Sequence, residues 1–84
     1  MTARVTVYPR KEILDPQGKA IREALTRVGF AGIADVRAGK SFEIRLDHED
    51  RERAERELRE MCRRLLANTV VEDFTIEILN GGRP

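Results

Sequence analysis

The sequence predicts an α+β fold in which two helices pack on one face of a four-stranded antiparallel sheet. Apolar and polar residues alternate in several short segments, which is typical of strands with one buried face. Two longer segments repeat apolar residues at the spacing of an amphipathic helix. The segments follow one another as strand, helix, strand, strand, helix and strand, and this is the order of a ferredoxin-like βαββαβ sandwich.

The first strand and the first helix are predicted from residues 5–8 and residues 16–28. The strand segment alternates and stops at a proline, which cannot donate to a sheet ladder. Asp15 is a good N-cap, and Pro16 suits the first helical position. Gly29 follows the helix, where a left-handed residue commonly ends it. One face of this helix carries the apolar residues Ala20, Ile21, Ala24, Leu25 and Val28.

Gly18 lies in the first turn of this helix, where glycine lowers helix stability by about 0.5–1 kcal/mol relative to alanine. A residue that costs stability indicates a second requirement at the same position. Because glycine has no side chain, it permits another stretch of backbone to approach closely. We therefore expect a backbone contact at Gly18.

The next two strands are predicted from residues 33–37 and residues 41–46, with a tight turn at residues 38–40 between them. A short connection that contains glycine between two such segments is typical of a β-hairpin. The apolar residues that alternate along the third strand are Phe42, Ile44 and Leu46. We expect them to lie on the buried face of the sheet.

The second helix is predicted to begin within residues 47–50 and to end near Ala67, and residues 71–79 form the last strand. The apolar stripe of this helix consists of Ala54, Leu58, Met61, Cys62, Leu65 and Leu66. The sheet face away from the helices is expected to carry Thr6, Tyr8, Ser41, Glu43, Arg45, Thr75, Glu77 and Leu79. We expect residues 80–84 to be a frayed tail.

The composition is that of one small domain covering residues 1–84. Hydrophobic residues make up 40% and charged residues 37%, and the formal net charge is +1. This balance predicts no general attraction to nucleic acid or to an anionic membrane. The single cysteine excludes an internal disulfide, and neither a signal peptide nor a membrane span is visible in the sequence. We therefore expect a cytoplasmic protein.

The residues that could carry chemistry do not form a recognisable catalytic or metal-binding pattern. Asp47, His48, Glu49 and Asp50 match no metal-ligand spacing, and acids are typical of a helix start. Cys62 falls on an apolar helix stripe, which predicts a buried and unreactive thiol. We expect no catalytic residues and no metal site, and the chain instead has the features of an interaction module.

Arg37 and Lys40 flank the predicted hairpin turn, with Gly39 between them. Together with Lys11 or Lys19 they are candidates for a phosphate site, since backbone N–H groups ahead of the first helix favour an anion. A glycine followed by a lysine is nevertheless far short of a phosphate-binding loop. The other interpretation is a solvated hairpin tip whose charges contact a partner protein.

Three blocks of this sequence resemble the PurS family, the small subunits of phosphoribosylformylglycinamidine synthase in purine biosynthesis. The first block is Leu14-Asp15-Pro16-Gln17-Gly18, and the second is Val36-Arg37-Ala38-Gly39-Lys40. The third covers residues 61–68 and continues through Val71-Glu72-Asp73-Phe74. The resemblance spans nearly the whole chain, and the order of all three blocks makes it specific.

The resemblance implies a non-catalytic subunit of an ATP- and glutamine-dependent ligase complex. Such a subunit bridges a synthetase subunit and a glutaminase subunit, so that ammonia passes between them. ATP and magnesium are then expected on the synthetase subunit, with no cofactor bound by this chain. A homodimer or tetramer is also implied. The residues expected to dock the partners are Asp15, Gln17, Gly18, Arg37, Gly39 and Lys40.

An alternative from another class stays open at this point. A ferredoxin-like regulatory module that binds a small ligand such as an amino acid would also dimerise and would use the loop before the first helix. Fold alone does not separate the two functions. Tight binding of glutamine or of a purine intermediate to the isolated protein would favour the regulatory module.

Overall fold

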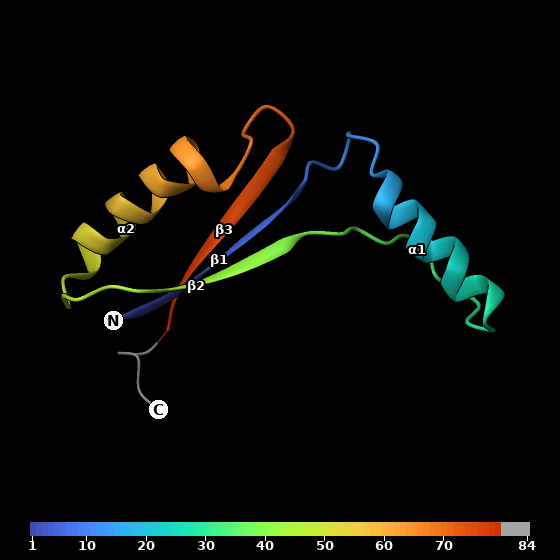
Figure 1. Cartoon of the computed structure of the whole chain (residues 1–84), viewed down its shortest axis with the longest axis horizontal. Coiled ribbons are helices and arrows are strands. Elements are labelled where there is room, and N and C mark those ends of the chain that lie inside the picture. Colours follow the sequence, from blue (N-terminus) through green and yellow to red (C-terminus); the bar gives the residue numbers. More distant parts are fainter. Residues whose placement is uncertain (80–84) are drawn as a thin grey trace.

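Three strands form one antiparallel sheet in the order β2-β1-β3, and the two helices lie at opposite ends of the molecule (Figure 1). The computed structural model describes residues 1–79, so the frayed tail expected at residues 80–84 lies outside the described residues. The strands are β1 (Thr2–Pro9), β2 (Lys40–Arg45) and β3 (Glu72–Leu79). The helices are α1 (Pro16–Arg27) and α2 (Arg51–Met61), and a π-helical turn over Cys62–Leu66 continues α2.

The alternation predicted from the sequence sorts the side chains onto the two faces of the sheet. On one face Val5 lies between Phe42 of β2 and Ile76 of β3. Helix α2 covers this face, and the fully buried residues of the resulting core are Ala3, Val5, Val7, Ala54, Leu58 and Cys62. The other face is polar, and on it Arg4 and Glu77 form an ion pair at 3.5 Å.

The π-helical turn changes which residues at the end of α2 are buried. The N–H of Ala67 donates to the carbonyl of Cys62 at 2.9 Å, five residues earlier, which widens the helix by one residue. Ala67 consequently enters the core, with 8% of its surface exposed, whereas Leu65 is 84% exposed. The prediction that Leu65 belongs to the buried stripe is wrong, because it assumed an unbroken α-helical period.

The hairpin predicted from residues 33–37 and 41–46 does not form within the chain. Residues 33–37 belong to no strand, and β2 begins at Lys40. Among the described residues positive φ angles occur at Gly29 and Gly32 and not at Gly39, and Lys40 already belongs to β2, so the turn predicted at residues 38–40 is absent. The segment before β2 is extended and runs into the strand (Figure 1). The sheet of the described residues therefore has three strands rather than four.

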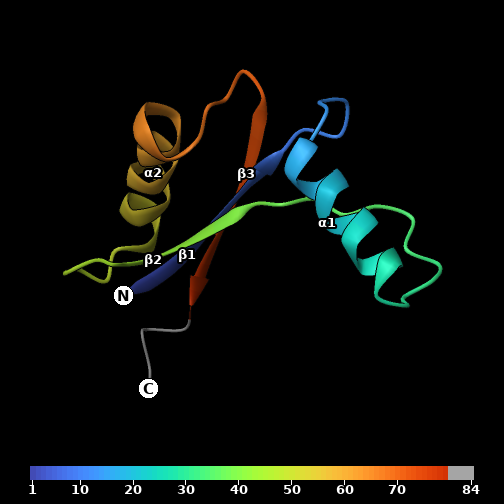
Figure 2. The ribbon, with the colours of Figure 1, turned by 45° about the vertical axis from the view of Figure 1, so that its right-hand side comes forward.

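Helix α1 projects away from the sheet instead of packing beside α2, so the molecule has the shape of an arch (Figure 1, Figure 2). The Cα radius of gyration is 16.0 Å, whereas a compact chain of this length has a value of about 12 Å. Both predicted helix ends are confirmed, since Asp15 is the N-cap and Gly29 has a φ of 109°. The prediction that both helices cover one sheet face is wrong for the single chain, and Ile21 and Val28 of the apolar stripe remain exposed.

Candidate functional site

Asp15 joins the start of α1 to the segment that leads into β2. Its Oδ1 accepts a hydrogen bond from the backbone N–H of Gly18 at 3.0 Å, which makes Asp15 the N-cap. Its Oδ2 accepts a hydrogen bond from the backbone N–H of Ala38 at 2.9 Å. One carboxylate therefore ties together two segments that are distant in the sequence. We call Asp15, Gly18, Val36, Arg37 and Ala38 the junction.

The side chain of Arg37 holds the loop before α1 by its backbone carbonyl groups. Its Nη1 donates to the carbonyls of Pro9 and Arg10 at 3.1 and 2.7 Å, and its Nη2 donates to the carbonyl of Lys11. Its Nε donates to Asp35 at 3.2 Å. These bonds use most of the donors of the guanidinium group within the chain. Arg37 is therefore not available to bind the phosphate that the sequence suggested for this region.

Two glycines let the backbone segments of this region approach each other. A Cβ atom at Gly18 would lie 2.1 Å from the carbonyl oxygen of Val36, far inside the contact distance. The backbone contact expected at Gly18 is therefore confirmed, and the approaching backbone belongs to the same chain. A Cβ atom at Gly39 would lie 2.5 Å from the carbonyl oxygen of Val7. Both glycines thus define the path of the segment that leads into β2.

The six residues expected to dock a partner divide into a structural group and an exposed group. Those whose contacts lie within the chain are Asp15, Gly18, Arg37 and Gly39. Gln17 and Lys40 are exposed, and within residues 1–79 neither side chain makes a hydrogen bond or an ion pair. Docking through these residues stays a prediction, with Gln17 and Lys40 as the side chains available for direct contact.

The environment of Asp15 stabilises its ionised form. The hydrogen bond from the N–H of Gly18, then the bond from Ala38 and the nearby guanidinium of Arg37, lower the pKa of Asp15 below its ordinary value. Such a carboxylate stabilises the folded protein above the unfolded pKa of about 3.9. This contribution disappears as the pH falls through the lower pKa of the folded state.

We expect the Asp15→Asn variant to have a lower Tm than the parent protein at neutral pH, because an amide can satisfy one of the two backbone donors but not both. The variant is also expected to lose less stability below about pH 4, since it lacks the titrating group. Thermal melts followed across acidic pH check both effects. Asp47→Asn, at an exposed carboxylate, is the control, and pH profiles that run parallel in Asp15→Asn and the parent would contradict the prediction.

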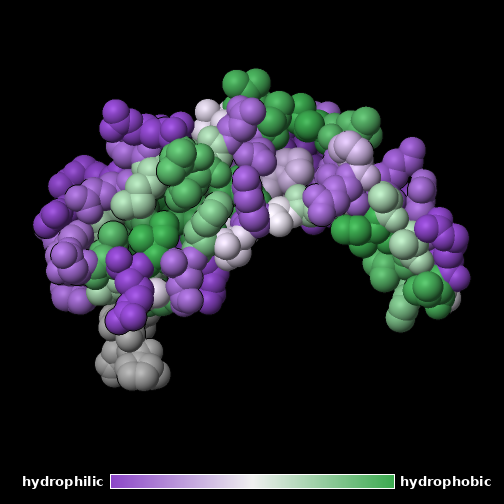
Figure 3. Space-filling view, viewed as in Figure 1, coloured by the Kyte–Doolittle hydropathy of each residue, from purple (hydrophilic) through white to green (hydrophobic). Residues whose placement is uncertain are grey.

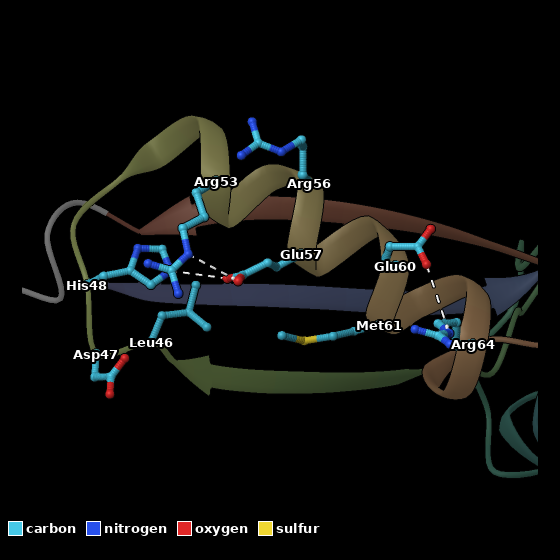
Figure 4. Close-up of a pocket in the computed structure, with 9 residues that line it drawn as sticks. All are labelled: Leu46, Asp47, His48, Arg53, Arg56, Glu57, Glu60, Met61 and Arg64. Carbon is cyan, nitrogen blue, oxygen red and sulfur yellow. Dashed lines mark hydrogen bonds and ion pairs between the residues drawn. The ribbon is translucent and has the colours of Figure 1, made fainter.

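An open groove of about 690 Å³ lies between α2 and the end of β2 (Figure 4). Leu46 and Met61 point into it between the helix and the sheet, and charged side chains surround them. The lining residues, here called the α2 groove, are Leu46, Asp47, His48, Arg53, Arg56, Glu57, Glu60, Met61 and Arg64. This site was not predicted from the sequence, because its residues lie on separate elements that meet only in the folded chain.

A hydrogen-bonded network closes one end of the α2 groove. His48 accepts a hydrogen bond at Nδ1 from the N–H of Asp50 at 3.2 Å, which assigns the ring hydrogen to Nε2. His48 Nε2 then donates to Glu57 at 3.1 Å, and Arg53 Nε donates to the other oxygen of Glu57 at 3.1 Å. These bonds from His48 and Arg53 lower the pKa of Glu57. Glu57 is thus an ionised acceptor with both oxygens occupied, which is a poor arrangement for acid or base catalysis.

The remaining candidates for chemistry have structural roles. Asp50 accepts a hydrogen bond from the N–H of Arg53 at 3.1 Å, so residues 47–50 form the predicted helix start. Cys62 is buried as predicted, and burial raises the pKa of its thiol. Within residues 1–79, no group of three or more histidines, cysteines and acids is placed to hold a metal ion. No helix in this part of the chain is both long enough and apolar enough to cross a membrane.

Hydrophobic side chains gather over the sheet and the adjoining side of α2, along the top of the arch, and on the inner side of α1, whereas the outer side of α2 is polar (Figure 3). These apolar parts of the surface are not covered by another element of the described chain. The arrangement is that of a protein that buries further surface on assembly.

Comparison with known proteins places the chain in a family. The family model described as PurS, phosphoribosylformylglycinamidine (FGAM) synthase, matches residues 2–80. The chain is 53% identical over 74 residues to the phosphoribosylformylglycinamidine synthase subunit PurS of Mycobacterium leprae, covering 88% of this chain and 90% of that protein. It is 40% identical over 75 residues to the PurS subunit of Bacillus subtilis, and the match covers 89% of this chain and 88% of that protein.

Solved structures agree with this assignment. The PurS structure from Bacillus subtilis has a TM-score of 0.83 at 38% identity and covers 94% of this chain and 98% of its own. A chain in the structure of PurLQS from Thermotoga maritima has a TM-score of 0.84 at 28% identity, and the match covers 93% of this chain and 95% of that one. The family model and the close relatives together show that the chain belongs to the PurS family of phosphoribosylformylglycinamidine synthase subunits.

Proposed function

We propose that this chain bridges the synthetase and glutaminase subunits of phosphoribosylformylglycinamidine synthase and has no catalytic residues of its own. Membership of the PurS family is the observation that carries the proposal. The similarity to a chain of PurLQS from Thermotoga maritima supports a role inside a larger complex. The chain thereby serves de novo purine biosynthesis.

An adaptor suits the chemistry of ammonia transfer between two enzymes. Free ammonia takes up a proton and diffuses away, so a synthetase gains from a source held close and correctly oriented. A rigid scaffold supplies this geometry through its shape and needs no reactive side chain. The buried thiol of Cys62 and the fully engaged carboxylate of Glu57 are in keeping with such a role.

The proposal assigns the small molecules and the contacts as follows. ATP and magnesium bind to the synthetase subunit, this chain binds no cofactor, and the complex works in the cytoplasm. Asp15, Gly18, Arg37 and Gly39 shape the docking surface from within, and their contacts inside the chain support this division. Exposed Gln17 and Lys40 make direct contacts with a larger subunit.

We also propose that two copies of the chain associate, and that the four-stranded ferredoxin-like sandwich forms in this dimer. The order β2-β1-β3 supplies three of the four strands, and α2 supplies one of the two helices. The apolar surface left open at both ends of the arch supports association (Figure 3). A tetramer would be two such dimers.

Copurification tests the bridging role. A tagged chain recovered from its host is expected to bring with it an ATP-dependent synthetase and a glutamine amidohydrolase, and the double variant Gln17→Ala/Lys40→Ala is expected to recover less of at least one of them. Glu55→Ala, on the exposed side of α2, is the matched control. Recovery of neither enzyme by the parent chain contradicts the proposal.

The isolated chain is also expected to hydrolyse neither glutamine nor ATP. Turnover that disappears in Cys62→Ala would overturn the non-catalytic role. Tight binding of glutamine to the isolated chain, measured by calorimetry, would favour the regulatory module instead.

A further inference from the structure

Two loops with exposed apolar side chains lie side by side at the top of the arch (Figure 1). Leu14 is 77% exposed on the loop before α1, and Val70 is 79% exposed on the loop before β3. The N–H of Arg10 in the first loop donates to the carbonyl of Val71 in the second at 3.0 Å. A single exposed apolar residue is ordinary, whereas a group of them marks a surface that contacts another molecule.

The loop that carries Val70 is fixed by its own hydrogen bonds. The side-chain oxygen of Asn68 accepts a bond from the N–H of Val70 at 3.2 Å, and the N–H of Asn68 donates to Glu72 at 2.8 Å. The guanidinium of Arg10 donates to the carbonyl of Thr69 at 2.6 Å, which ties this loop to the residue that follows β1. A loop that is already ordered loses little conformational entropy when a partner binds.

The loop that carries Leu14 is fixed in the same way. Arg37 donates to the carbonyls of residues 9–11, and the N–H of Ile13 donates to the carbonyl of Arg10 at 3.0 Å. Directly after Leu14, the N-cap begins α1. Leu14 thus lies exposed between two fixed backbone positions, so ordered loops present both apolar side chains.

An open groove of about 380 Å³ separates the two loops. Its lining includes Ile13, Leu14, Gln17, Val71 and Glu72, and these residues are here called the loop groove. Apolar side chains from both loops therefore border one hollow. Gln17, which is put forward above as a contact with a larger subunit, lies along the same groove, so the loop groove continues the proposed docking surface.

The loop groove carries acidic charge. The charged side chains among the residues that line it are Asp15 and Glu72. Both oxygens of Asp15 accept backbone hydrogen bonds, and the guanidinium of Arg37 lies nearby. Glu72 binds the N–H of Asn68 through one oxygen, and within residues 1–79 its other oxygen has no hydrogen bond or ion pair. The complementary occupant therefore has a basic side chain next to an apolar one.

We propose that the loop groove binds a segment of a larger subunit of the complex. An apolar side chain of that segment lies between Leu14 and Val70, and a lysine or arginine lies beside Glu72. This proposal rests on the bridging role put forward above and places one of the bridging contacts. The proposed dimer uses the apolar surface at the two ends of the arch, whereas the loop groove lies at the top between them (Figure 3). The groove is thereby left open for a different protein.

Recovery of the larger subunits by tagged variants tests this contact. Leu14→Glu and Val70→Glu each add a carboxylate beside the acidic groove, and each is expected to recover at least several-fold less of one larger subunit than the parent chain. Both side chains are exposed, so the fold and the elution volume of the free chain are expected to stay those of the parent. Thr26→Glu, at an exposed position near the other end of α1, is the matched control and is expected to recover as much as the parent.

A milder variant separates the charge of the loop groove from its shape. Glu72→Gln keeps a side-chain oxygen for the N–H of Asn68 but removes the charge. It is expected to weaken recovery and to make recovery less sensitive to added salt, because salt screens an exposed charge pair. Recovery equal to that of the parent at every salt concentration overturns the assignment of a basic side chain beside Glu72.

A photoreactive p-benzoylphenylalanine in place of Val70 identifies the occupant. Irradiation of the assembled complex is expected to join the chain to one larger subunit, at a peptide that contains a lysine or arginine. A product made only of two copies of the chain assigns the loop groove to self-association and overturns the proposal.

The outcomes separate this contact from the bridging role. If the parent recovers both larger subunits and Leu14→Glu and Val70→Glu recover as much, the loop groove is not a docking site and the bridging role stands. If these variants instead change the elution volume of the free chain, the groove belongs to a contact between copies, which also overturns the proposal. If the parent recovers neither subunit, the bridging role fails and the loop groove fails with it.

Discussion

The Gly18→Ala variant is expected to be less stable than the parent protein by about 1–3 kcal/mol, the usual cost of overpacking. The sign makes this a sharp test, because the same change at an ordinary helical position stabilises by about 0.5–1 kcal/mol. At Gly18 the added Cβ would lie 2.1 Å from the carbonyl oxygen of Val36, and backbone cannot move aside as a flexible side chain can. The junction has to open to admit the methyl group.

Denaturant melts of Gly18→Ala and of Lys19→Ala separate this clash from helix propensity. Lys19 is the next residue of α1 and is exposed, so its replacement is expected to change stability by less than about 0.5 kcal/mol. The position of α1 relative to the sheet depends on the junction. Gly18→Ala is therefore also expected to weaken the association of two copies. A Gly18→Ala protein as stable as the parent would show that the contact with Val36 has no energetic weight.

The Leu58→Ala variant is expected to lose about 2–5 kcal/mol of the free energy of unfolding. Leu58 is fully buried and is the largest side chain that α2 inserts into the core over β1. A chain of this length has a total stability of roughly 4–13 kcal/mol, so the loss is a large share of the whole. We expect a protein that is partly unfolded at 37 °C.

Leu65→Ala is the matched control for Leu58→Ala, because it removes the same atoms from the same helical segment. Leu65 is 84% exposed after the π-helical turn, so its truncation is expected to change the stability of the monomeric fold by less than about 0.5 kcal/mol. Calorimetric Tm values of the two variants check the difference. Equal losses would mean that the helix continues in the α form and buries Leu65 as the simple periodicity predicts.

The π-helical turn shows where sequence periodicity stops being informative. Apolar residues at positions 58, 61, 62, 65 and 66 fit an α-helical stripe, and four of the five are indeed buried or half-buried. The hydrogen bond from Ala67 to Cys62 shifts the last turn by one residue and exchanges Leu65 for Ala67 in the core. The apolar periodicity of the sequence does not record this shift.

The candidate site was predictable in its parts but not in its arrangement. The cap by Asp15 and the need for a close backbone contact at Gly18 both follow from local chemistry, and both are confirmed. That the second oxygen of Asp15 binds Ala38, and that Arg37 binds the carbonyls of the loop before α1, depends on contacts between residues more than 20 positions apart. The α2 groove, which joins the end of β2 to α2, was missed for the same reason.

The sequence by itself determined the α+β class, the faces of the strands, the ends of α1 and the family of the chain. These features depend on alternation, capping and short motifs, in which each residue acts through near neighbours or through its own shape. Only the tertiary structure shows that residues 33–37 do not belong to the sheet and that α1 points away from it. Both features depend on contacts between residues far apart in the sequence: the N–H of Ala38 donates to Asp15 and the carbonyl of Val36 lies against Gly18, so this segment lies beside the start of α1.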